Sequence, residues 1–214
     1  MATSTSRSFE RFKATLARAD SLCDLYDRLL KLKLKKEPTR FNHSDIADLL
    51  RSAIVLSVAS MDYYFTARFA ELLVPFLKRS GPTPGLTSLL TDAGLDAKTS
   101  LEMLSMDRPY RRIRTLIDAH FEKYTTQRAD VVNRLFLAYG VKDLLGNAQR
   151  KCNRKRLVRS VELLVERRHA IVHEGDLNDH GKLRDVARAE VRTRVTNLKA
   201  LVEAAHAITV GVAP

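Results

Sequence analysis

The sequence is poor in residues that break helices or cross-link a chain. Its 214 residues include only 8 Gly, 6 Pro and 2 Cys, and no Trp. The two cysteines, Cys23 and Cys152, are too few for a disulfide framework or a cysteine metal cluster, and a reducing cytoplasm is their simplest setting. Because long stretches contain neither Gly nor Pro, we expect an all-α protein.

The signatures of several functional classes are also missing. No apolar run approaches the roughly 18 residues that a membrane-spanning helix needs. The sequence has no Walker loop, HExxH zinc motif, nucleophile elbow or Gly-rich dinucleotide motif. His43, His120, His180 and His206 have no spacing partners for a metal site, so we expect them at the surface or at helix ends. We therefore expect no membrane segment, no metal and no cofactor.

Positive charge, in contrast, is abundant and unevenly spread. The formal net charge is +12, and residues 107–168 hold 16 Lys and Arg against 7 Asp and Glu. This excess indicates an anionic partner, most simply RNA or DNA. A solvated basic surface without any polyanion would have the same composition.

The densest basic cluster is "RKCNRKR", at residues 150–156. Its basic residues are Arg150, Lys151, Arg154, Lys155 and Arg156. The cluster is either a solvated turn or a row of phosphate contacts that would bind RNA without reading its bases.

Hydrophobic periodicity predicts a long helical hairpin in the first third of the chain. The first helix should run from about residue 8 to 36, because Pro38 stops it. The second should begin after Asn42 or Ser44, either of which can cap it, and reach about residue 79. It is apolar over most of its circumference, which indicates the central helix of a bundle.

The remaining pattern predicts several shorter helices at about 80–150 and two long helices, at about 153–173 and 182–209. Long helices with short connections are typical of an up-and-down bundle. We expect one domain over residues 1–214, an up-and-down helical bundle with an inserted segment of shorter helices at about 80–150.

The stretch "VERRHAIVHEGD" places an arginine on the apolar face of the helix predicted at 153–173. On a helical wheel, Arg168 lies about 20° from Leu157, within the apolar stripe. A guanidinium there needs a carboxylate, a bound anion or the mouth of a cleft, because an unpaired buried charge is very costly. An internal ion pair without any substrate is therefore one explanation for Arg168.

His173 lies near the end of the same helix, about 140° around the axis from Arg168 and about 7.5 Å along it. By position alone, it fits a C-terminal histidine that the helix dipole stabilises. The two side chains converge only if the last turn deforms before Gly175, or if two copies meet at a two-fold axis. Two arginines and two histidines would then surround a shared cleft.

Two polar residues of the second helix are candidates to support Arg168. Arg51 and Asp62 lie three turns apart on one face of that helix. Asp62 either orients Arg168 or neutralises Arg51.

The segment "RRHAIVH" resembles the R-x4-H signature of HEPN domains, a helical nucleotide-binding superfamily. Arg168 matches the motif arginine, His169 the polar position after it, and His173 the motif histidine. The stretches "DLLRSAIVLSVASMDYYF" and "HEGDLN" are similar to the corresponding segments of prokaryotic, RiboL-PSP-HEPN-like ribonucleases. The resemblance covers about residues 44–79 and 153–205.

The resemblance implies a metal-independent endoribonuclease that acts as a homodimer with both motifs facing one cleft. His173 would provide acid–base catalysis, Arg168 would stabilise charge on the phosphate, and His169 would support the phosphate or line the dimer contact. The products would be a 2′,3′-cyclic phosphate and a 5′-hydroxyl. Such proteins serve as toxins or phage-defence effectors, so an antitoxin or another defence-system protein is an implied partner.

Two other functions fit the same residues. The chain could be a non-catalytic dimer of the HEPN fold that binds RNA or a partner protein. It could also be a basic helical adaptor of no particular family. The presence of both Arg168 and His173 favours the ribonuclease.

Overall fold

The computed structural model describes residues 6–34, 41–121 and 125–212, which fold entirely as helices and connecting loops. The prediction of an all-α bundle is therefore confirmed. Over these residues there is no strand, and only an isolated bridge pairs Leu177 with Leu183. None of the helices in the described ranges is long and apolar enough to cross a membrane.

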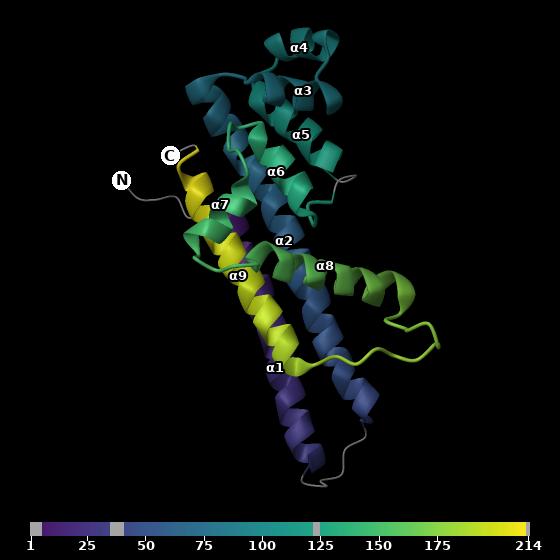
Figure 1. Ribbon diagram of the computed structural model, residues 1–214. Coiled ribbons are helices and arrows are strands. Elements are labelled where there is room, and N and C mark those ends of the chain that lie inside the picture. Colours follow the sequence, from purple (N-terminus) through teal and green to yellow (C-terminus); the bar gives the residue numbers. More distant parts are fainter. Residues whose placement is uncertain (1–5, 35–40, 122–124, 213–214) are drawn as a thin grey trace.

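Two long helices form an antiparallel hairpin (Figure 1), α1 (Arg7–Leu34) and α2 (His43–Ser80). Asn42 begins α2 with a capping box, in which its side chain accepts from the Asp45 amide at 2.9 Å and Asp45 accepts from the Asn42 amide at 2.8 Å. This reciprocal pair satisfies two of the free amides at the helix start. Of the two predicted caps, Asn42 is the one that is used.

Five short helices follow, α3 (Pro84–Asp92), α4 (Ala97–Leu104), α5 (Pro109–Phe121), α6 (Ala129–Leu137) and α7 (Leu144–Lys151). The predicted run of shorter helices at 80–150 is thus present. In Figure 1, α3, α4 and α5 lie around the end of α2 that is remote from the α1–α2 connection.

Two long helices close the chain, α8 (Leu157–Glu174) and α9 (Arg188–Val210). In Figure 1, α9 runs beside α1 and α2, whereas α8 crosses α2 and projects to one side. The expected start of the last helix, near residue 182, is wrong by six residues. The Leu177–Leu183 bridge and a bond from the Arg184 amide to the Asp176 carbonyl, at 2.9 Å, hold this segment as a hairpin-like loop instead.

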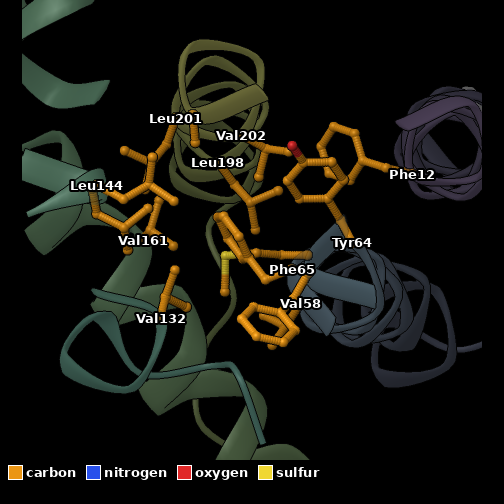
Figure 2. Packing of buried hydrophobic residues seen from close by; sticks show 14 of the residues in the cluster. Phe12, Val58, Tyr64, Phe65, Val132, Leu144, Val161, Leu198, Leu201 and Val202 are labelled. Atoms are coloured by element: carbon orange, nitrogen blue, oxygen red, sulfur yellow. The ribbon is translucent and has the colours of Figure 1, made fainter. Parts of the chain in front are cut away.

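The core lies around α2, which is buried on several sides, as its apolar circumference predicts. Figure 2 shows Phe65 and Val58 of α2 facing Leu198 and Val202 of α9, with Val161 of α8 close by. Each fully buried aromatic or leucine side chain contributes about 1.5–3 kcal/mol to stability. Buried side chains in the first two turns of α8 anchor this helix in the core. Its last turns lie next to α2.

Candidate active site at the end of α8

The last turns of α8 carry the arginine and the histidine that the sequence singles out. Val161 and Leu164 are buried on the inner face, and Arg168 continues this row in a half-buried position. The Nε atom of Arg168 is buried and donates to no group in the described part of the chain. The Nε atoms of Arg167 and Arg192 are likewise unbonded, but other nitrogen atoms of these two residues form ion pairs. Arg168 forms no hydrogen bond or ion pair with the described residues, which leaves its guanidinium available to an anion.

The histidines are exposed on the outer side of the same turns. The rings of His169 and His173 lie 4.5 Å apart, centre to centre, with an angle of 42° between their planes. Residues four apart on a helix are neighbours, which explains this contact. The structure therefore gathers two imidazoles on one side of the helix end and one guanidinium on the other.

Gly175 ends α8 in the left-handed region, with φ of 64°. This turn lets the Asp176 amide donate back to the Ala170 carbonyl at 3.0 Å, a helix ending in which glycine is favoured. As a result, the Asp176 carboxylate is carried back beneath the helix and is fully buried.

Two arginines share the Asp176 carboxylate. Its Oδ2 atom accepts from Arg51 Nε at 2.7 Å and from Arg167 Nη2 at 2.8 Å. Arg51 also donates to the Arg184 carbonyl at 2.6 Å, and Arg167 to the Asp185 carbonyl at 3.0 Å. This cluster of Arg51, Arg167 and Asp176, which we call the arginine clamp, ties α2, α8 and the α8–α9 loop together at the end of α8.

The structure does not bring Asp62 into a bond with Arg51 or Arg168. Its Oδ1 atom accepts from the backbone amide and the hydroxyl of Thr126, at 2.6 and 2.7 Å, and its Oδ2 atom accepts from Gln127 at 2.9 Å. Although Arg51 and Asp62 share a face of α2, about 16 Å of helix separates them. Arg51 instead pairs with Asp176 and, at 3.0 Å, with Asp48 one turn before it.

The basic cluster at 150–156 lies at the opposite end of α8 from His173, about 25 Å away along the helix axis. Arg150 pairs with Asp143 at 3.1 Å, and Arg154 donates to Asn197 at 3.2 Å. The remaining basic side chains of the cluster are exposed: Lys151, Lys155 and Arg156. This surface belongs to the end of α7 and the turn before α8, so it and the motif do not form one site.

A pocket of about 660 Å³ adjoins the motif. One wall belongs to α2 and the other to the last turn of α8 and the loop after it. Ile171 and Gly175 of this wall follow Arg168 by one and two turns on the same side of the helix. The pocket, which we call the α2–α8 pocket, is therefore reached from the face that carries Arg168.

The histidines outside the motif show one unexpected placement. His206 stacks on Phe9, with ring centres 4.0 Å apart, and its Nδ1 atom lies 3.1 Å from the Tyr64 hydroxyl. Burial lowers the pKa of His206 to about 4. It is thus a neutral, half-buried packing residue, where we expected a surface or capping histidine. Within the described ranges, no three His, Cys, Asp or Glu side chains gather as a metal site would require.

Sequence reasoning missed Asp176 and Arg167. The Gly-Asp pair after the motif marks where the helix stops, and this ending carries the aspartate inward. Arg167 lies beside the apolar stripe, where periodicity alone does not distinguish a solvent-facing arginine from a paired one.

A family model described as RiboL-PSP-HEPN matches residues 22–209. The match confirms the resemblance to HEPN domains. It also covers the middle third of the chain, which lies outside the segments that resemble the family by motif. HEPN domains are typically ribonucleases, so the family indicates RNA as the substrate. No curated protein and no solved structure matches the chain.

Proposed function

We propose that this chain, which belongs to the RiboL-PSP-HEPN family, is an endoribonuclease that cleaves RNA by attack of a ribose 2′-hydroxyl, without a metal ion. One observation carries the proposal: the half-buried Arg168, which bonds to no group of the described residues, lies on the helix end that also presents His173. A phosphate oxygen would accept from its guanidinium.

The chemistry follows from these two groups. An imidazole titrates near neutral pH, so His173 can take the proton from the 2′-hydroxyl as that oxygen attacks the adjacent phosphorus. Arg168 donates to the phosphate oxygens as negative charge develops on them. The 5′-oxygen leaves with a proton from a second imidazole. The products are a 2′,3′-cyclic phosphate and a 5′-hydroxyl, and His169 supports the phosphate or the dimer contact.

The guanidinium that acts with each His173 is best supplied by a second copy of the chain. Within one α8 helix, Arg168 and His173 point in directions about 140° apart. Three large apolar side chains around this helix end are more than two-fifths exposed: Val172, Leu177 and Leu183. Apolar groups gathered in this way are typical of protein–protein contacts. A two-fold contact here would bring two motifs to one cleft.

The biological setting that we propose is a toxin or a phage-defence effector, with an antitoxin or another defence protein as the partner. The alternative function is a non-catalytic dimer of the same fold that binds RNA or a partner protein. Both share the fold and the dimer, and they differ only in chemistry.

A defined RNA with one 2′-deoxy position tests the mechanism. Cleavage should stop on the 3′ side of that nucleotide and continue elsewhere, because only the missing hydroxyl can attack the phosphate. Unchanged cleavage at the 2′-deoxy position would exclude the proposed attack. Intact RNA at every position, with binding retained, would favour the non-catalytic alternative.

A further inference from the structure

The α2–α8 pocket has the volume and the lining of a site for one ring system. Its volume, about 660 Å³, lies in the range of small-molecule sites. Aliphatic side chains from both walls line it: Val55, Leu56, Ile171 and Leu183. Such walls can cover both faces of a nucleobase without reading its edge.

The polar groups of the pocket are mainly hydrogen-bond acceptors. Arg51 lies in the lining, but three of its five N–H groups already donate, to Asp176, Asp48 and a backbone carbonyl. Asp48 Oδ2 accepts no hydrogen bond from the described residues. Ser52 adds a hydroxyl. A matching ligand edge therefore presents several N–H donors side by side.

Guanine is the base that meets this requirement. Its N1–H and N2 amino group form two adjacent donors on one edge, which a carboxylate can accept together. Adenine and cytosine offer one amino group on that edge, and uracil a single ring N–H. The Asp48 side chain is 62% exposed, so its carboxylate can reach a base that enters from solvent.

The position of the pocket links this base to the proposed cleavage. Ile171 lies one turn beyond Arg168 on the same side of α8, so a nucleotide with its base in the pocket would extend its phosphate along the side of α8 that carries Arg168. We infer that the α2–α8 pocket holds a guanine of the RNA next to the cleaved bond, with Asp48 as the residue that selects it. This inference rests on the proposed function and adds a base preference to it.

Binding without cleavage tests the pocket directly. We would use the His173→Ala variant and labelled uridine octamers with one central G, A, C or inosine, and measure fluorescence anisotropy. The G octamer should bind about tenfold more tightly than the A octamer, as expected for a well-placed bidentate base contact. Inosine, which lacks the N2 amino group, should fall between them.

The Asp48→Asn change, added to that variant, should reduce the affinity for G to the level for A. Asp92→Asn is the matched control, because Asp92 is also an exposed helical aspartate but lies on α3. It should leave the preference intact. Equal affinities for the G and A octamers without Asp48→Asn would overturn the inference. So would a preference for G that remains in the Asp48→Asn variant. So would an effect of Asp48→Asn on dimerisation alone, which would mean that a side chain of the second copy fills the pocket.

The two proposals fail in different ways. If the wild-type protein cuts RNA and the sequenced ends show no enrichment of G, the guanine pocket is wrong and the ribonuclease stands. If G octamers bind preferentially but the wild-type protein cuts nothing, the catalytic proposal is wrong and the pocket stands.

Discussion

Arg51 and Asp176, which are 125 residues apart in the chain, meet in the interior with 2.7 Å between Nε and Oδ2. The bond fixes the end of the motif helix to the start of α2. Because Arg167 joins the same carboxylate oxygen at 2.8 Å, one buried negative charge holds two positive ones beside the candidate active site. The carboxylate of Asp176 therefore anchors the end of the helix that carries His173.

Removing the charge of Asp176 should destabilise the protein. In Asp176→Asn, the two guanidinium groups lose their shared counter-charge, and breaking a buried pair typically costs about 3–5 kcal/mol. Urea unfolding would measure this change. Asp179→Asn is the control, because Asp179 is exposed in the same loop. Equal unfolding midpoints for the two variants would mean that the arginine clamp contributes nothing to stability.

Acid should weaken the fold through His206. The unfolded pKa is near 6.5 and burial lowers the folded pKa to about 4, so the unfolded chain binds the proton first as pH falls. The free energy of unfolding should therefore be fully retained above pH 6.5 and decline from 6.5 towards 4. His206→Phe should keep the stacking on Phe9 and remove this decline.

Neighbouring charges determine the pH range in which unfolding reports on His206. Arg68 and Lys13 lower the pKa of His206, while Glu71 and Glu10 raise it. Although burial raises the pKa of Glu71, hydrogen bonds from Ser8 and Ser6 hold that pKa below its usual value. The stability that the Glu71 carboxylate contributes is therefore lost only in stronger acid. Unfolding should therefore be compared between pH 8 and 5. His180→Gln, at an exposed site, should keep the wild-type slope, and an identical slope in His206→Phe would refute this role.

The two motif residues should lose activity for different reasons. Loss of a general base typically costs about 10²–10⁴-fold in rate, so His173→Ala should nearly abolish turnover without unfolding an exposed helix end. Arg168→Ala should lower the chemical step by about 10²–10³-fold, because it acts on charge that develops in the transition state. Single-turnover kinetics would separate this step from binding. If Arg168→Ala weakened RNA binding but left the rate of the chemical step unchanged, Arg168 would be a phosphate contact without a catalytic role.

The basic cluster at 150–156 should govern affinity and leave the cut position unchanged. Reversing Arg154 and Lys155 to Glu should weaken RNA binding, and each lost phosphate contact should flatten the slope of log K against log salt by about 0.7. Phosphate contacts carry no base information, so the sequenced cut sites should stay the same. An unchanged salt slope would show that these side chains form a solvated turn.

The dimer should depend on the apolar side chains at the end of α8. Val172→Asp places a charge among them, so light scattering should show a monomer, and cleavage should be lost. Leu104→Asp is the matched control, because Leu104 is 82% exposed but lies on α4. It should remain a dimer. A wild-type monomer at tens of micromolar that still cuts RNA would exclude the shared cleft.

Local patterns predicted the helices, whereas the contacts between helices required the structure. The start of α2 was predictable because Asn42 and Asp45 cap it within one turn. The partners of Asp62 are not predictable in this way, because a shared face of a helix does not reveal which loop crosses it, and here that loop carries Thr126 and Gln127. The partner of Arg51 was hidden for the same reason, since Asp176 reaches it only after the left-handed turn at Gly175.

The most direct test of the ribonuclease proposal is mass spectrometry of the RNA ends left after incubation of a mixed RNA pool with the wild-type protein in EDTA. We predict fragments with 2′,3′-cyclic phosphate and 5′-hydroxyl ends, and none above background with His173→Ala purified in the same way. Uncut RNA in EDTA that is cut once Mg²⁺ or Mn²⁺ is restored would contradict the metal-independent mechanism. Equal cutting by His173→Ala would contradict the assignment of the catalytic histidine.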